Sequence, residues 1–268
     1  MLVTLENTSY SDVIGSSSMP YLNSLAQKYA LATNYYANFH PSIGNYFMLT
    51  SGQGITNDDS FNGPLPQSVD NIVRELTSAG KTWKSYAESL PNVGYIGGDR
   101  GAYLHRHNPL SYFYDVVNNP AQQANLMPFT QFAVDLAAGN LPNYSFVVPN
   151  VYDDAHSCPA NMSNCTLSDR LGIADTWLQT NLAPLIANAG FQKSGLLVIT
   201  FDEAEDSDTT NGGGHIAAVL VSPQLKQGYQ STTLYQHQSL ERFSMELLGV
   251  TTIPGAGATA PDMTEFLP

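Results

Sequence analysis

The stretch LLVITFDE, residues 196–203, is a short apolar run rich in branched side chains that ends in two acids. The segment LVTLEN, residues 2–7, has the same pattern near the start of the chain, with Glu6 and Asn7 at its end. Runs of this length and composition predict buried strands of a parallel sheet rather than helices. The two segments therefore favour an α/β fold with polar groups at the carboxyl ends of its strands.

Those polar groups predict a metal site. Ligands of an open α/β sheet bind in the crevice outside the carboxyl ends of the strands. Three carboxylates and one amide oxygen meeting there would repel one another without a cation, and hard metal ions prefer oxygen donors. The alternative is that acids at strand ends only face solvent or cap the next helix. The predicted ligands are Glu6, Asn7, Asp202 and Glu203.

A third segment, HPSIGNYFMLTSG at residues 40–52, predicts a helix that begins near Ser42 and ends at Gly52. The free N–H groups at a helix N-terminus bind phosphate and other anions. A serine hydroxyl attacks only when it is activated, and coordination to a divalent cation is one way to activate it. Ser42 is therefore a candidate nucleophile, and the alternative is a plain capping serine.

The remainder of the chain alternates between predicted helices and strands. Apolar residues at helical spacing predict helices over residues 69–76, 129–136 and 177–186, ending at Gly80, Gly139 and Gly190. Strands are predicted at residues 146–148, 196–201 and 216–221. This alternation predicts a three-layer αβα sandwich with a largely parallel central sheet. At 268 residues, the chain is expected to form a single catalytic domain, residues 1–268.

The composition excludes several classes of partner. The formal net charge is −13, with only 10 Lys and Arg. Such a charge repels nucleic acid and anionic membranes, so neither is an expected partner. No run of 18 apolar residues is present, so no integral membrane segment is expected. Protonation of carboxylates would relieve the repulsion of an anionic substrate, which favours an acidic pH optimum.

Taken in order, the segments resemble the phosphoesterase family of bacterial acid phosphatases and phospholipases C within the alkaline phosphatase superfamily. The resemblance covers nearly the whole chain. It implies an alkaline-phosphatase-like fold and a small phosphate-ester substrate. The segments that carry the resemblance are residues 5–10, 20–23, 40–52, 83–88, 107–109, 149–150, 153–156, 199–203, 214–215, 221–223 and 235–240.

The same resemblance implies one divalent metal ion, Zn, Ca, Mg or Mn, bound by the strand-end residues together with Ser42. It also implies that Asn45 binds a phosphoryl oxygen. The implied ligands are Glu6, Asn7, Ser42, Asp202 and Glu203.

Phosphate-ester cleavage also needs donors for the developing charge and a proton for the leaving alkoxide. His107 and His156 lie in family-like segments and are predicted to be catalytic. His215 follows three glycines and is either a phosphate donor or a turn residue. His105 and His237 are expected to be structural.

The cysteines bear on where the protein functions. Cys158 and Cys165 lie in one loop without a Cys-x-x-Cys pattern, so a local disulfide is favoured over free thiols. The bond is expected to hold the loop that carries His156. Met1 directly precedes the first strand, so no signal peptide is expected in this chain. The chain is then either a mature fragment of a secreted or periplasmic protein or a cytoplasmic protein, and the cysteines and the family resemblance favour the first.

The sequence therefore predicts a metal-dependent acid phosphatase that hydrolyses phosphomonoesters through a phosphoserine intermediate. Two alternatives stay open. One is a phospholipase C or another phosphodiesterase, which needs only room for a second ester arm. The other belongs to a different class, a non-catalytic binding protein on the same fold.

Overall fold

The computed structural model describes residues 1–268, and the chain divides into two compact units. Each unit is assembled from segments that are distant in the sequence. The expectation that both belong to one catalytic domain stays a prediction. Unit 1 comprises Met1–Ala37, Pro149–Tyr235 and Thr264–Pro268, and unit 2 comprises Asn38–Val148 and Gln236–Met263.

The sheet of unit 1 has the strand order β1-β6-β7-β2-β8. β1 and β6 are parallel, with Leu5 opposite Phe201, and β2 and β8 are also parallel. β7 is antiparallel to both of its neighbours. The strands are β1 (Leu2–Leu5), β2 (Ala30–Tyr36), β6 (Leu197–Phe201), β7 (His215–Val221), β8 (Tyr229–Ser231) and the short β9 (Tyr235–Gln236), which pairs with β2 as the chain leaves unit 1.

The reversed direction of β7 follows from the connection before it. Residues 202–214 contain no helix, whereas a parallel connection needs a crossover of a dozen or more residues, usually a helix. The prediction of a largely parallel sheet is confirmed, with β7 as the exception. The predicted strands at residues 196–201 and 216–221 are confirmed to within one residue at each end.

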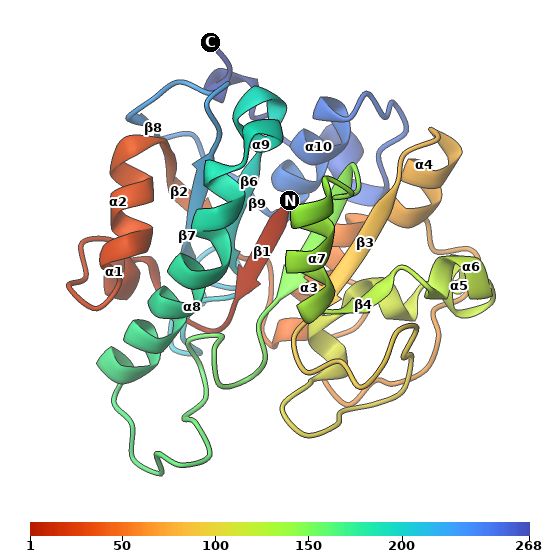
Figure 1. The fold of residues 1–268 in the computed structure, drawn as a ribbon, viewed down its shortest axis with the longest axis horizontal. Coiled ribbons are helices and arrows are strands. Elements are labelled where there is room, and N and C mark those ends of the chain that lie inside the picture. The colour runs from red at the N-terminus through yellow and green to blue at the C-terminus, as the bar shows by residue number, and fades with distance from the viewer. The chain divides into compact units, whose positions relative to one another are not determined.

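Helices lie alongside the strands of unit 1, as Figure 1 shows for α2 and α8. α2 contacts β2, β7 and α8. The helix predicted over 177–186 is part of the longer α8, which does not end at Gly190. Asn188 follows its last residue and caps α9 instead, accepting the N–H groups of Gly190 and Phe191. The helices are α1 (Tyr10–Val13), α2 (Pro20–Lys28), α8 (Leu167–Ala187), α9 (Ala189–Ser194) and the short η4 (Thr264–Phe266).

The sheet of unit 2 has the order β4-β3-β5, and both pairs are parallel. α7 contacts β3 and β4, and α4 contacts β3. Gly139 caps α7 with a left-handed φ of 68°, as predicted. The strands are β3 (Trp83–Ala87), β4 (Leu126–Pro128) and β5 (Tyr144–Val148).

The helices of unit 2 include two that pack on each other, α3 and α10. The predicted helix at residues 40–52 is α3, and its C-cap is Gly52 with a φ of 61°. None of the helices of the chain combines the length and the apolar composition needed to cross a bilayer. The helices are α3 (Ser42–Ser51), α4 (Ile72–Ser78), η1 (His105–His107), η2 (Pro109–Tyr112), α5 (Tyr114–Val117), α6 (Pro120–Gln123), α7 (Thr130–Ala138), α10 (His237–Leu247) and η3 (Gly255–Thr259).

Candidate functional site

The four strand-end residues come together in unit 1. The parallel register of β1 and β6 places Leu5 opposite Phe201, so the residues that follow them leave the sheet side by side. Burial is nearly complete for the three acids, with exposed fractions of 1% for Glu6, 0% for Asp202 and 1% for Glu203. Carboxylates this deeply buried are costly unless a proton or a cation neutralises them.

Hydrogen bonds fix the orientation of Asn7. Its backbone N–H donates to Oδ1 of Asp202 at 3.0 Å, and its side-chain Nδ2 donates to Oε1 of Glu203 at 2.6 Å. The backbone N–H of Glu203 donates to the same Asp202 oxygen at 2.7 Å. Asn7 has a φ of 39°, a left-handed conformation that Asn tolerates better than most residues. The amide oxygen of Asn7 is buried and has no hydrogen-bond partner.

These contacts fit a divalent cation. The available donor atoms are carboxylate oxygens and the amide oxygen of Asn7, which accepts no hydrogen bond from the protein. Asp206 brings a carboxylate oxygen within 4.8 Å of one from Glu203, which adds a further acid at this edge of the sheet. Hard cations such as Ca²⁺, Mg²⁺ and Mn²⁺ bind such oxygen donors, and Zn²⁺ also accepts carboxylates.

Asp154 joins the loop after residue 149 to this cluster. Its carbonyl accepts the N–H of Glu6 at 2.8 Å, and its side-chain Oδ1 accepts the N–H of His156 at 2.9 Å. Burial raises the pKa of Asp154 well above its usual value, and the charge of Asp202 adds to this effect. Ala155, between the two hydrogen-bonded residues, has a φ of 80°, so the turn is a strained one.

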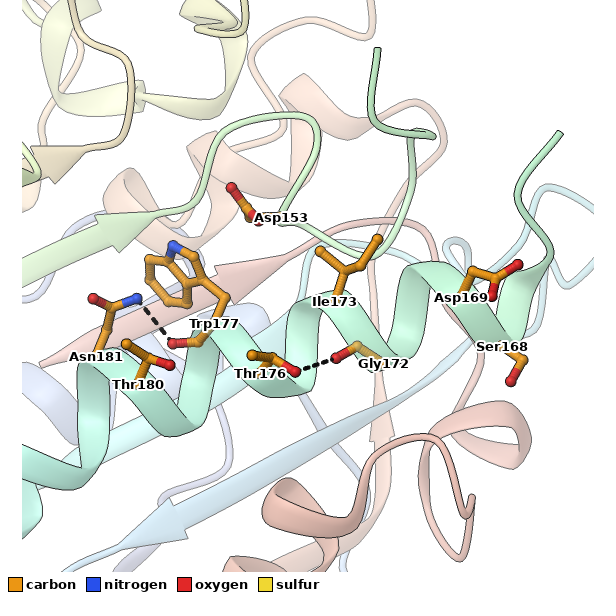
Figure 2. Close-up of a pocket in the computed structure, with 9 residues that line it drawn as sticks. All are labelled: Asp153, Ser168, Asp169, Gly172, Ile173, Thr176, Trp177, Thr180 and Asn181. Carbon is orange, nitrogen blue, oxygen red and sulfur yellow. Dashed lines mark hydrogen bonds between the residues drawn. The ribbon is translucent and has the colours of Figure 1, made fainter. Parts of the chain in front are cut away.

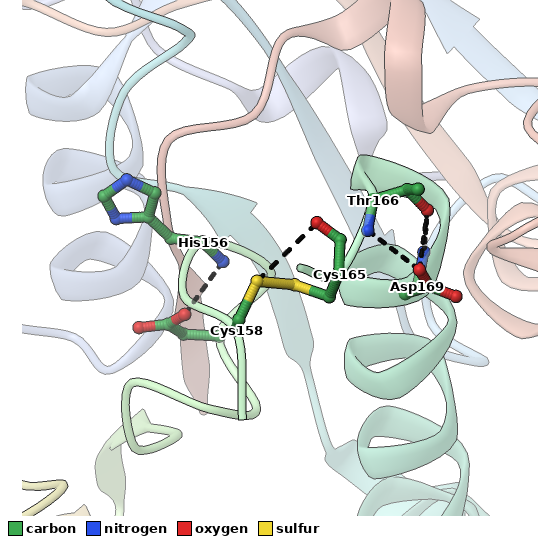
Figure 3. The surroundings of a disulfide bond; sticks show 6 residues. His156, Cys158, Cys165, Thr166 and Asp169 are labelled. Atoms are coloured by element: carbon green, nitrogen blue, oxygen red, sulfur yellow. Dashed lines mark hydrogen bonds between the residues drawn. A yellow bond between two sulfur atoms is a disulfide. The ribbon is translucent and has the colours of Figure 1, made fainter. Parts of the chain in front are cut away.

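His156 is exposed, and the disulfide follows it in the same loop. The predicted bond between Cys158 and Cys165 is present, and Figure 3 shows it between His156 and the start of α8. Thr166 caps α8 in a reciprocal arrangement with Asp169. The loop is therefore anchored at one end by Asp154 and at the other by the disulfide and the helix cap.

His215 is held by several contacts in unit 1. Its ring stacks on Tyr10 with a centroid distance of 4.3 Å and on Tyr36 at 4.8 Å. Its Nε2 lies 3.0 Å from the carbonyl of Thr33, so that nitrogen carries a proton and donates it. These are the contacts of a structural residue, and a catalytic role for His215 stays a prediction.

Ser42 is the first residue of α3 in unit 2, with Pro41 at the N-cap position. It therefore lies in the first turn, one of the two placements that the sequence predicts. The next N–H of the helix, that of Ile43, donates to Asp59 at 3.1 Å. An acid at this place is favourable because of the helix dipole.

Asn45 is fully buried one turn further along α3. Its Oδ1 accepts the N–H groups of Asn38 and Phe39, both at 3.0 Å, and its Nδ2 donates to the carbonyl of Phe39 at 2.8 Å. The amide thus holds the segment before Ser42 in place. Binding of a phosphoryl oxygen by Asn45 stays a prediction.

His107 lies in η1 and is buried, and its ring stacks on Tyr46 of α3 at a centroid distance of 5.3 Å. This contact places it beside the helix that begins with Ser42. His105 has a different environment, because its Nδ1 bonds to Asn62 at 2.6 Å and its ring stacks on Tyr112. Burial lowers the pKa of His105 to about 4, so it is neutral at physiological pH, in agreement with a structural role.

The structure thus brings together the four strand-end residues in unit 1, and Ser42, Asn45 and His107 around α3 in unit 2. A single centre made from both groups stays a prediction. Sequence reasoning missed Asp154 and Asp206. Asp154 lies in a segment that carries the family resemblance, next to His156. Asp206 is an exposed acid in a polar loop and gave no signal.

Unit 1 also contains a surface groove of about 490 Å³ along α8, shown in Figure 2. Its polar side chains are used by the helix itself, since Thr176 donates to the carbonyl of Gly172 and Asn181 to that of Trp177. Two carboxylates, Asp153 and Asp169, also line it, which disfavours an anionic ligand. The groove therefore adds no catalytic group to the candidates above.

Comparison with known proteins identifies relatives over most of the chain. The family model described as "Phosphoesterase family" matches residues 13–251. A probable acid phosphatase of Kluyveromyces lactis is 33% identical over 245 residues, covering 89% of this chain and 55% of that protein. An acid phosphatase of Aspergillus fumigatus is 32% identical and covers 89% of this chain and 52% of that protein. The chain therefore spans about half the length of these fungal relatives.

A bacterial relative is matched more completely. The phosphatidylinositol-3-phosphatase of Mycobacterium tuberculosis is 30% identical, covering 99% of this chain and 81% of that protein. Among solved structures, a protein of the alkaline phosphatase superfamily from Vibrio parahaemolyticus has a TM-score of 0.64 at 12% identity, covering 99% of this chain and 71% of that one. The phosphonate monoester hydrolase of Silicibacter pomeroyi has a TM-score of 0.61 at 13% identity, covering 100% and 76%. These likenesses show the fold, an α/β fold of the alkaline phosphatase type with helices flanking a mostly parallel sheet.

Proposed function

The chain belongs to the phosphoesterase family, and from this premise we propose that it is a metal-dependent phosphate-ester hydrolase that acts as an acid phosphatase on monoesters. The observation that carries the proposal is the cluster of buried acids at the ends of β1 and β6, with the unpartnered amide oxygen of Asn7 among them. A cluster of this kind needs a cation, and the reactions that divalent cations assist include phosphoryl transfer.

One divalent ion would be held by the four strand-end residues and Ser42. When bound, the ion supplies positive charge that favours ionisation of a hydroxyl and offsets the charge of the phosphoryl oxygens. The proposed ligands are Glu6, Asn7, Asp202, Glu203 and Ser42.

The covalent steps belong to the side chains. Ser42 Oγ gives its proton to solvent water and attacks phosphorus in line with the leaving oxygen, so the Oγ–P bond forms as the ester P–O bond breaks. His107 or His156 donates a proton to the leaving alkoxide. A water molecule then gives a proton to that histidine and attacks the phosphoserine, its oxygen bonds to phosphorus as the Oγ–P bond breaks, Ser42 Oγ regains a proton from solvent, and inorganic phosphate leaves. Asn45 and the N–H groups of the first turn of α3 bind the phosphoryl oxygens.

The relatives bear on substrate and location. Acid phosphatase is the printed name of the fungal relatives, and the mycobacterial relative is named for a phosphorylated inositol lipid, so monoesters on an alcohol or a polyol are the proposed substrates. The disulfide supports function in an oxidising compartment, which is the secreted or periplasmic location proposed here.

Substitution of the nucleophile tests the proposal. In metal-reconstituted protein, Ser42→Ala should lower kcat on an aryl phosphomonoester by about a thousandfold or more, because the covalent route is lost. Ser78→Ala, an exposed serine at the end of α4, is the matched control and should leave kcat unchanged. Mass spectrometry of acid-quenched wild type should detect phosphate on the peptide that contains Ser42.

The same measurements separate the alternatives. Retention of more than about a tenth of wild-type turnover by Ser42→Ala would exclude it as the nucleophile. Turnover of a phosphodiester but not of monoesters would identify a phosphodiesterase. Metal binding without turnover of either ester would identify a non-catalytic binding protein on this fold.

A further inference from the structure

Glu241, in the middle of α10, is a buried carboxyl group without a hydrogen bond. Its exposed fraction is 2%, and neither Oε1 nor Oε2 has a partner. Buried polar atoms in proteins are almost always hydrogen-bonded, and burial of an unpaired carboxylate is strongly unfavourable. The group is in unit 2 and belongs to none of the candidate site residues, and the mechanism above does not use it.

The carboxyl group lies against two backbone segments at positions where only glycine leaves room for it. A Cβ atom on Gly52, the C-cap of α3, would lie 2.8 Å from Oε2 of Glu241. A Cβ atom on Gly257, in η3, would also collide with Oε2. Glu241 therefore fills the space between the end of α3 and η3, and all three elements are in contact through it.

The charges that face Glu241 from other elements are negative or neutral. Asp70, which precedes α4, interacts electrostatically with the carboxyl group of Glu241. Tyr144 on β5 also interacts electrostatically with Glu241. α3 presents the negative end of its dipole, and its one titratable side chain is Tyr46. η3 has no titratable side chain, and Glu75 of α4 hydrogen-bonds to Asp70.

On α10 itself, no cation compensates the carboxyl group. Arg242 donates to Glu246 at 2.7 Å and to the carbonyl of Ala260, so its guanidinium is used elsewhere. His237 lies one turn earlier and is buried, and no hydrogen bond joins it to Glu241. Burial, with the charge of Asp70 added to it, raises the pKa of Glu241 well above its usual value.

A proton fits this site better than a metal ion. Glu241 belongs to no group of three acidic, imidazole or thiol side chains close enough to share one ion. The space that an ion would occupy is taken by the backbone of Gly52 and Gly257. The neutral acid requires only the proton, which occupies no space beyond that of the carboxyl group.

We propose that Glu241 is a proton-dependent latch, which in its neutral form fastens α10 to the end of α3 and to η3 and which releases these elements when it ionises at alkaline pH. Ionised Glu241 would have to reach water, and η3 and the end of α3, which lie against the carboxyl group, would have to move to admit it. Because α3 begins with Ser42, release at one end of this helix loosens the support of the residue at the other. The latch thus restricts the fully packed state of unit 2 to acidic and neutral conditions.

The linkage between proton binding and folding determines whether stability rises or falls with pH. The folded protein holds the proton of Glu241 at pH values where the unfolded chain, with an ordinary glutamate, has lost it. Stability from this group is therefore complete below the unfolded pKa and is lost as pH rises toward the folded pKa. Relative to Glu241→Gln, a neutral side chain of the same shape, the unfolding equilibrium constant of wild type should rise by up to about tenfold per pH unit.

The experiment measures denaturant unfolding of wild type and Glu241→Gln from about pH 5 to about pH 9, with hydrogen exchange of residues 252–259 at each pH. The protection factors of these amides, which correct for the base-catalysed intrinsic rate of exchange, should fall at alkaline pH in wild type and not in the variant. Glu246→Gln, an acid of the same helix that is paired with Arg242, is the control and should keep the wild-type pH dependence. A ratio of unfolding constants that does not change with pH would overturn the proposal.

A second measurement does not depend on the stability of the glutamine variant. The infrared band of a protonated carboxyl group should be present in wild type at neutral pH and missing from Glu241→Leu, whose side chain is of similar size. The band must disappear over the same pH range in which the protection of residues 252–259 from exchange falls. Absence of any difference between the two spectra at neutral pH would also overturn the latch.

Discussion

Asn7 is prepared for a cation by the hydrogen bonds that it makes to its neighbours. Its backbone N–H and its side-chain Nδ2 both donate to acids of the next strand, so only the amide oxygen is left for a metal ion. The strand-end pattern predicted that Asn7 and Asp202 would be neighbours. It could not predict the left-handed φ of Asn7 or the direction of its amide, because both depend on contacts with residues about two hundred positions away.

Removal of one strand-end acid should change the unfolding temperature differently in the presence and in the absence of metal. Glu6→Gln and Asp202→Asn should both lose metal, measured by elemental analysis, and in metal-containing buffer both should unfold at a lower temperature than wild type. In chelator, Glu6→Gln should unfold at the same temperature as wild type or at a higher one, because one fewer buried carboxylate lowers the repulsion among the acids when no metal is bound.

Glu205→Gln, an exposed acid close in sequence, is the control for this pair and should behave as wild type in both buffers. Full metal occupancy in both ligand variants would contradict the ligand set. A decrease in melting temperature of the same size in chelator and in metal would mean that the acids support the fold and not the ion.

The residues that sequence reasoning missed share one physical reason. Asp154 and Asp206 lie in loops, and each reaches the cluster through the folded path of its loop rather than through the end of a strand. Strand register is readable from an apolar run, but a loop's path depends on individual hydrogen bonds such as that from Glu6 to Asp154. Site residues that lie in loops are therefore identified from the structure and not from the sequence pattern.

At the scale of elements, helix ends separate the correct predictions from the incorrect ones. α7 ends at a left-handed glycine with no competing cap, and its end was predicted correctly. α8 ends at Ala187, three residues before Gly190, because the side chain of Asn188 caps the helix that follows. Its beginning was also missed, although Thr166 and Asp169 have the spacing of a capping box. Local side-chain competition decided both ends of α8.

The η4 segment gives a pH prediction at this scale. Glu265 of η4 accepts hydrogen bonds from Tyr229 at 2.9 Å, from Tyr235 at 2.6 Å and from Ser231. Burial by itself would raise the pKa of Glu265, but these hydrogen bonds outweigh burial and lower the pKa. Its stabilising effect is therefore present above the pKa of an unfolded glutamate and is lost as pH falls through the lowered folded value.

Glu265→Gln should accordingly reduce the free energy of unfolding by about 1 kcal/mol at neutral pH, a modest value because the carboxyl group is only half-buried. The difference from wild type should shrink as the pH approaches about 3, measured by urea unfolding. Tyr229→Phe, which removes a single donor, should lose less stability at neutral pH. A Glu265→Gln difference that is the same at both pH values would rule out a role for the charge.

At the scale of the whole molecule, the net charge of −13 should act on substrate capture. The Debye length falls from about 30 Å at 0.01 M salt to about 8 Å at 0.15 M, so added salt screens the repulsion between the protein and an anionic ester. We expect kcat/KM for a dianionic aryl phosphate to increase several-fold over this range, whereas kcat changes little.

A monoanionic phosphodiester is the comparison substrate if the enzyme turns it over, and a smaller increase is expected for it because its charge is smaller. The measurement is made with an inert monovalent salt at fixed pH and saturating metal. A decrease of kcat/KM with salt for the dianion would show that a local positive field, and not the net charge, governs capture.

The pairing of β1 with β6 also determines when the proposed metal site can form during synthesis. β1 is made before its neighbour, and that neighbouring strand and both acids that follow it are made some two hundred residues later. At translation rates of about 5 to 20 residues per second, Glu6 and Asn7 wait at least about ten seconds for their partners. During this interval the nascent chain cannot assemble the proposed site, so any metal bound there is taken up only after β6 is complete.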